Sequence, residues 1–208
     1  MIGESTAKLL YNLFVDTIQT GDPFLKRILT EALLLLVIFA SASAAAERKE
    51  GLGITMADFI DKLGYACSRV PNGITEKQID DNYHTNDDGN VTISYSSSII
   101  ILINRHKSAQ YVRNVAVTYV FEDSDKSANY HDHGYTPDEE VIFSSICMQT
   151  VLALNRGMTV PEARDLLKAI GLYGALLDGV QRSKKHDGNL YIMKLQPNGM
   201  AVMAVSHI

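Results

Sequence analysis

Residues 91–121, VTISYSSSIIILINRHKSAQYVRNVAVTYVF, decide the fold class. The stretch contains three segments with the residue types of β-strands: 91–95, 98–104 and 114–121. Apolar and polar side chains alternate in the first and third, as in strands with one buried face. The middle segment contains the apolar run 99–103, which predicts a central strand buried on both faces. Because the connections are short, we expect an antiparallel meander.

A helical pattern precedes these strands. Residues 54–70 place apolar side chains, including Cys67, on one face of a helix, with Thr55 as its N-cap. Residues 71–73, Pro-Asn-Gly, end this helix, and residues 75–81 predict a further short helix.

Two more helices follow the strands. Pro137 and the three carboxylates that come after it suit the first turn of a helix that ends near residue 155. Thr159 and Glu162 form the pattern of a capping box, and the helix that they open ends at Gly171. One face of each helix is apolar, so we expect both to pack on the sheet.

The C-terminal residues predict a hairpin. Segments 190–195 and 200–206 have strand composition and flank residues 196–199, Gln-Pro-Asn-Gly, which have strong turn chemistry. The element order is therefore α-βββ-αα-ββ, which separates helices from strands and is typical of the α+β class. We expect a single antiparallel sheet of about five strands, with the helices packed on one face.

Residues 32–46, ALLLLVIFASASAAA, predict the compartment in which the chain works. A basic pair, Lys26-Arg27, precedes an apolar run, and small residues follow that suit cleavage after Ala44 or Ala46. The apolar run is short for a membrane span of about 20 residues. An uncleaved anchor and a buried helix stay as alternatives.

We therefore expect two parts. Residues 1–46 form a leader with a signal peptide or membrane anchor, and residues 47–208 form an exported globular domain, periplasmic or secreted. Membrane contact is expected only through the N-terminal segment, if that segment is not cleaved.

Charge restricts the class of partner. The chain has a net charge of −5, and residues 1–46 contribute −1 of it, so residues 47–208 carry −4. A mildly acidic domain is a poor match for a phosphate backbone, so we expect no nucleic-acid partner. The basic run Lys184-Lys185-His186 is interpreted as a solvated turn. The expected partner is an unidentified protein or small ligand.

The two cysteines, Cys67 and Cys147, each lie on the apolar face of a predicted helix. In an oxidising compartment an even and small number of cysteines is typical of a disulfide, so we predict a Cys67–Cys147 bond. Two free core thiols are the alternative, since a core-facing cysteine does not offer the exposed thiolate that a nucleophile needs.

His131 and His133 are the candidate metal ligands. They stand two residues apart in the polar segment 122–135, and in an extended segment both would point to the same side. No HExxH pattern accompanies them, and a solvated histidine-bearing loop is the alternative interpretation.

No motif of the sequence indicates a catalytic centre or a cofactor. The chain has no GxSxG elbow and no glycine-rich phosphate loop. The sequence therefore predicts a non-enzymatic, exported binding domain that acts in the cell envelope or outside the cell, with no catalytic residue assigned. The alternatives are a small metal-dependent hydrolase that uses His131 and His133, an envelope immunity or inhibitor protein, and a membrane-held structural subunit.

Overall fold

The structure is a computed structural model, and residues 50–207 form one compact unit in it. It describes residues 51–105, 111–120, 137–173, 180–196 and 200–208. Two of the predictions above fall outside these ranges. They are the export segment 32–46 and the metal ligands His131 and His133.

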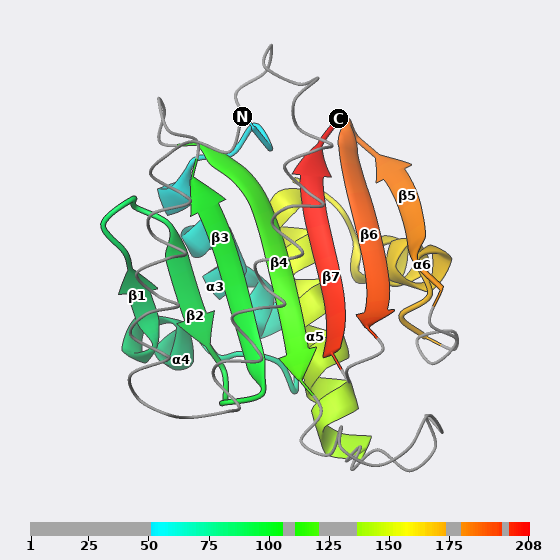
Figure 1. Ribbon diagram of the computed structural model, residues 1–208, viewed down its shortest axis with the longest axis horizontal. Helices are drawn as coiled ribbons and strands as arrows, with labels where there is room; N and C mark the ends of the chain where they lie inside the picture. The colour runs from blue at the N-terminus through cyan, green and yellow to red at the C-terminus, as the bar shows by residue number, and fades with distance from the viewer. Residues whose placement is uncertain (1–50, 106–110, 121–136, 174–179, 197–199) are drawn as a thin grey trace. The chain divides into compact units, whose positions relative to one another are not determined.

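The described strands form a single antiparallel sheet of seven strands, in the order β1-β2-β3-β4-β7-β6-β5 (Figure 1). Their bounds are β1 Tyr83–Thr85, β2 Val91–Ser94, β3 Ile99–Arg105, β4 Val112–Val120, β5 Arg182–His186, β6 Asn189–Gln196 and β7 Met200–His207. The α+β class and the single antiparallel sheet are confirmed. The strand number is corrected from about five to seven, because β1 and β5 are short, polar edge strands without an apolar alternation.

The register places one row of side chains in the core. Ile101 lies opposite Val117, which in turn lies opposite Met203, and all three are fully buried. The prediction that β3 is buried on both faces is wrong, because Ile100 and Leu102 on its other face are only partly buried. In β7, by contrast, seven of the eight residues are buried.

Four described helices pack on one face of the sheet (Figure 1). They are α3 Met56–Arg69, α4 Glu76–Asp81, α5 Pro137–Leu154 and α6 Val160–Ala169. The predicted caps are confirmed. Thr55 accepts the Asp58 N–H at 3.1 Å, and Thr159 forms a capping box with Glu162.

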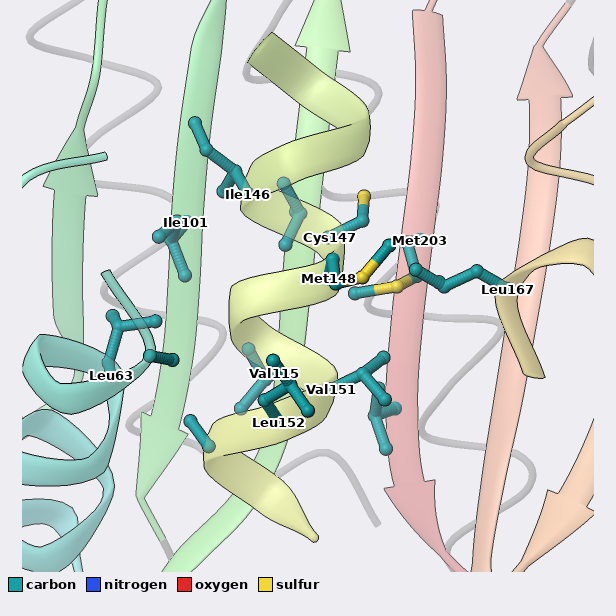
Figure 2. Close-up of a cluster of buried hydrophobic side chains, with 14 of the residues drawn as sticks. Leu63, Ile101, Val115, Ile146, Cys147, Met148, Val151, Leu152, Leu167 and Met203 are labelled. Carbon is teal, nitrogen blue, oxygen red and sulfur yellow. The ribbon is translucent and has the colours of Figure 1, made fainter. Parts of the chain in front are cut away.

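Helix α5 lies at the centre of the core, where α3 packs on one of its sides and α6 on the other. Figure 2 shows Ile146, Met148 and Val151 of α5 among side chains from the sheet and from both neighbouring helices. All three are buried. Complete burial of such side chains stabilises the fold by about 1.5–3 kcal/mol each.

The element order repeats within the chain. The series α3-α4-β1-β2-β3-β4 is followed by α5-α6-β5-β6-β7, which matches it apart from the short strand β1. The last strands of the two series, β4 and β7, pair at the middle of the sheet. A short motif recurs at the second helix of each series. It is Gly73-Ile74-Thr75 before α4 and Gly157-Met158-Thr159 before α6, with a capping box in both cases. The domain is thus built from two similar halves.

Side chains from each half bind the helix connection of the other half. The Gln149 side chain of α5 accepts the Ile74 N–H at 3.0 Å and donates to the carbonyls of Val70 and Ile74 at 3.0 and 3.1 Å. In return, Arg69 of α3 donates to the Met158 carbonyl at 3.0 Å. These bonds hold the two helix pairs together and fix the turn between α5 and α6, which borders the site described next.

Candidate functional site

The candidate site includes β5, an edge strand whose composition is polar and basic. It lies at the end of the sheet and pairs with β6 alone among the described strands (Figure 1). Its sequence is Arg-Ser-Lys-Lys-His, and residues 183–186 are exposed. A basic edge of this kind stands out on a chain whose net charge is −5.

A tight turn sets which backbone groups of β5 face outward. Asp187 and Gly188 have φ of 48° and 76°, the pattern of a two-residue type I′ turn, which an Asp-Gly pair favours. The pair that closes such a turn, His186 and Asn189, exchanges backbone hydrogen bonds. From there, hydrogen-bonded and non-hydrogen-bonded residue pairs alternate along β5 and β6. The N–H and C=O groups of Lys184 therefore point to β6, whereas those of Ser183 and Lys185 point away from the sheet.

A cleft of about 600 Å³ lies between β5, α6 and the turn that joins α5 to α6. Its apolar lining residues are Met158, Leu166 and Ala169. Its charged lining residues carry both signs, with Arg156 and Lys184 against Glu162, Asp165 and Asp187, and the ring of His186 also lines it. The cleft therefore combines a short apolar floor with charges of both signs.

Glu162 is held in place on the wall of the cleft. Its carboxylate accepts the Thr159 N–H and the Thr159 hydroxyl, both at 2.7 Å. These two bonds, with a smaller contribution from nearby His186, lower the pKa of Glu162 from its ordinary value. The carboxylate therefore stays ionised and fixed at the start of α6, which suits a group that orients a ligand.

A buried polar pair lies beneath the cleft. The Tyr191 hydroxyl accepts from the Asn155 side-chain N–H at 2.8 Å and donates to its carbonyl oxygen at 3.1 Å. Burial raises the pKa of Tyr191, and the hydrogen bond from Asn155 opposes part of that rise. The ring of His186 meets the ring of Tyr191 edge-on, with centroids 6.5 Å apart. Tyr191 thus supports β5 from the core side.

The predicted disulfide between Cys67 and Cys147 is corrected, because both cysteines are free thiols in the structure. Although α3 and α5 pack together, the two thiols have different neighbours. Cys67 Sγ donates to the Leu63 carbonyl of its own helix at 3.1 Å and lies near Glu76, whereas Cys147 is fully buried and lies near Tyr173.

Neither thiol has the environment of a nucleophile. Burial, with a smaller effect of the Glu76 charge, raises the pKa of Cys67 to about 11. Burial alone raises the pKa of Cys147 well above its ordinary value. A nucleophilic cysteine needs a lowered pKa, so both are packing residues of the core.

The described residues show neither a metal cluster nor a membrane-spanning helix. Within those ranges, no three His, Cys, Asp or Glu side chains converge on a point where they could hold a metal ion. His131 and His133 lie outside these ranges, so the metal site stays a prediction. Of the helices that the structure describes, none is both long enough and apolar enough to cross a bilayer.

Comparison of the chain with family models, curated proteins and solved structures finds no match. The site offers a basic strand edge, a cleft with charges of both signs and no activated nucleophile among the described side chains. Such an arrangement is suited to binding.

Sequence reasoning missed β5. The interpretation of Lys184, Lys185 and His186 as a solvated turn is wrong, because these residues belong to β5, and the run has no apolar residue to indicate a strand. The signal that could have found it is the Asp187-Gly188 pair, which is a strong hairpin turn directly before the predicted strand at 190–195.

Proposed function

We propose that residues 47–208 act as an exported, non-enzymatic binding domain whose partner docks on β5 and the adjoining cleft. The observation that carries the proposal is the exposed, basic edge of β5, whose outward backbone groups have no partner strand among the described residues. An immunity or inhibitor protein would be one form of such a domain.

The chemistry of the cleft supports binding at this place. Charges of both signs surround a small apolar floor, so the cleft offers polar and apolar contacts to a ligand side by side. The hydrogen bonds of Glu162 and of the Asn155–Tyr191 pair hold the walls in place before any ligand arrives. Such preorganisation lowers the entropy cost of binding.

Retention of a partner from an envelope extract tests the proposal when matched variants are compared. The double variant Lys184→Glu/Lys185→Glu reverses two exposed charges on β5. Lys77→Glu is the control, because it reverses an exposed charge on α4 in the other half of the domain. Surface changes of this kind alter stability by only about 0.5 kcal/mol, so all chains should fold.

The expected result is a protein that the wild type and the Lys77→Glu control retain and that the β5 variant loses. A protein retained equally by all three chains would contradict a binding site at β5. Failure of the wild type to retain any protein would contradict the binding function itself.

The export proposal has its own support in residues 32–46, where a basic pair, an apolar run and small residues follow in order. Expression of the full chain in a bacterial host and mass measurement of the periplasmic fraction test it. We expect a mature chain that begins at residue 45 or 47. An intact chain confined to the cytosol would contradict export and leave the binding proposal open to its own assay.

A further inference from the structure

We propose that the partner is an extended acidic segment that adds to β5 as an eighth strand of the sheet, with carboxylates on alternate residues beside Lys185. The inference rests on the proposed function, because it names the chemistry of the partner that binds at β5. It follows from the backbone, the charge and the apolar surface at this edge.

The backbone supplies the first argument. Ser183 and Lys185 present N–H and C=O groups on the outer side of β5, as the register of the hairpin requires. An extended peptide can satisfy these groups by strand addition, in which main-chain hydrogen bonds supply affinity and side chains supply specificity. Both residues are exposed, so the edge is accessible along these positions.

The two faces of the added strand would meet different side chains of β5. Lys185 lies opposite Leu190 and Ser183 opposite Ile192, on the face of the sheet away from α6. On that face Lys185 is the only charged residue of β5, and none of the acidic residues of the cleft lies there. A carboxylate of the partner is therefore best placed on this side.

The other face of β5 borders the cleft, which already contains three carboxylates. Lys184 and Arg156 stand among Glu162, Asp165 and Asp187, so a further carboxylate would meet repulsion as well as attraction. The apolar floor formed by Met158 and Leu166 suits a small apolar side chain instead. The favoured partner therefore alternates acidic and apolar residues.

The same lysines disfavour a second copy of this chain as the occupant. Two β5 edges would bring Lys184 and Lys185 against their own counterparts, and lysines on edge strands are a common protection against self-pairing. An acidic strand meets attraction where a second β5 meets repulsion. Charge thus selects between the two occupants of the same backbone edge.

Three synthetic peptides test the inference with the full chain. The first is acetyl-TEVEVET-amide, which alternates carboxylates with valines. The second, acetyl-TKVKVKT-amide, reverses the charge. The third has the sequence of the first but carries N-methyl groups on alternate backbone amides, which removes the hydrogen bonds of one strand edge and leaves the charge unchanged.

Binding is measured by titration, and amide hydrogen exchange reports its mode. With the acidic peptide at tenfold excess over its Kd, we expect exchange at Ser183 and Lys185 to slow roughly tenfold. The Lys184 amide, already bonded to β6, should change little. Lys185→Glu should weaken binding of the acidic peptide roughly tenfold, since it replaces an attraction by a repulsion, whereas Lys77→Glu should leave it unchanged.

Each outcome decides the inference. Slower exchange at Ser183 and Lys185, with loss of binding on N-methylation or charge reversal, supports it. Equal binding of the acidic and the lysine peptide, binding that survives N-methylation, or absence of binding at millimolar peptide overturns it. The proposed function is tested independently, because the retention assay with the Lys184→Glu/Lys185→Glu variant does not use these peptides.

Discussion

Gly73 leaves the space that the side-chain amide of Gln149 occupies. A Cβ atom at position 73 would overlap with this amide, which is fully buried and bonded to the backbone at Val70 and Ile74. A glycine in the connection between α3 and α4 thus permits a contact from α5 in the other half of the domain. The relationship makes the packing of the two halves testable.

Gly73→Ala should destabilise the domain. The added methyl group must displace a buried amide that makes three hydrogen bonds, and such overpacking costs about 1–3 kcal/mol. Gly64→Ala is the matched control. In α3 its Cβ would lie 3.7 Å from the Glu76 side chain, an ordinary contact, and alanine in a helix is favoured over glycine by about 0.5–1 kcal/mol. Urea denaturation should therefore give changes of opposite sign.

Gln149→Met should cost about 2–4 kcal/mol in the free energy of unfolding. It keeps the volume of the side chain but leaves a buried N–H and two carbonyls at Val70 and Ile74 without their partner.

The residue after Gln149 should show the opposite effect on stability. Thr150 Oγ1 is buried and has no hydrogen-bond partner among the described residues, so Thr150→Val should be neutral or stabilise by about 1 kcal/mol. Equal losses at both positions would contradict this account of the α5 contacts.

The helix positions show what could be predicted from the sequence. Thr55, Thr75 and Thr159 start helices through short-range bonds to residues three positions ahead, so the local sequence is sufficient to locate them. The contact of Gln149 with Ile74 joins residues 75 positions apart. No periodic pattern indicates such a contact, and the glycine that permits it resembles any turn glycine.

The cap of α6 should matter for the wall of the cleft. Thr159→Ala removes the hydroxyl that accepts the Glu162 N–H, and loss of such a cap costs about 1 kcal/mol of stability, whereas Thr159→Ser should retain most of the cap.

The pKa of Glu162 is lowered in the folded chain. The contribution of Glu162 to stability is therefore present above the ordinary pKa of 4.5 and is lost as pH falls through the folded pKa. Denaturation at several pH values should show that this acid dependence is weaker in Thr159→Ala. An unchanged profile would contradict the bond.

The cysteines should react slowly in the folded chain. At about pH 8 the thiolate fraction of Cys67 should be roughly a hundredfold lower than that of an ordinary cysteine, because its pKa is raised to about 11. Alkylation followed by mass spectrometry should modify neither thiol quickly in the native state. After denaturation without reductant, both should be modified. A denatured chain that takes up no alkylating agent would contain the disulfide that the structure lacks.

The raised thiol pKa values also predict loss of stability in alkali. The folded chain holds these protons above pH 9.0, the ordinary thiol value, so their contribution is complete below that pH and is lost as pH rises through about 11 for Cys67. Cys147→Ala should unfold with a weaker dependence on alkaline pH than the wild type, as measured by urea midpoints at about pH 8 and pH 10. An identical dependence would contradict the burial of an ionisable thiol at this position.

The candidate site was less predictable than the fold. The apolar alternation of β2 and β4 indicates which face is buried, whereas β5 has only polar residues and is a strand because β6 pairs with it. A strand of this kind depends on its hairpin turn and on pairing with its neighbour. Core packing therefore does not determine the residue types of β5. The polar composition that made β5 hard to predict from the sequence is also what supports the proposal that its edge binds a partner.

The most direct test of the central claim is amide hydrogen exchange along β5 in the free protein. An accessible edge predicts an alternation, with rapid exchange at Ser183 and Lys185 and exchange at Lys184 slower by a factor on the order of ten or more, since only the Lys184 amide is bonded to β6. Protection at Ser183 and Lys185 equal to that at Lys184 would show that the edge is already occupied and would contradict the account.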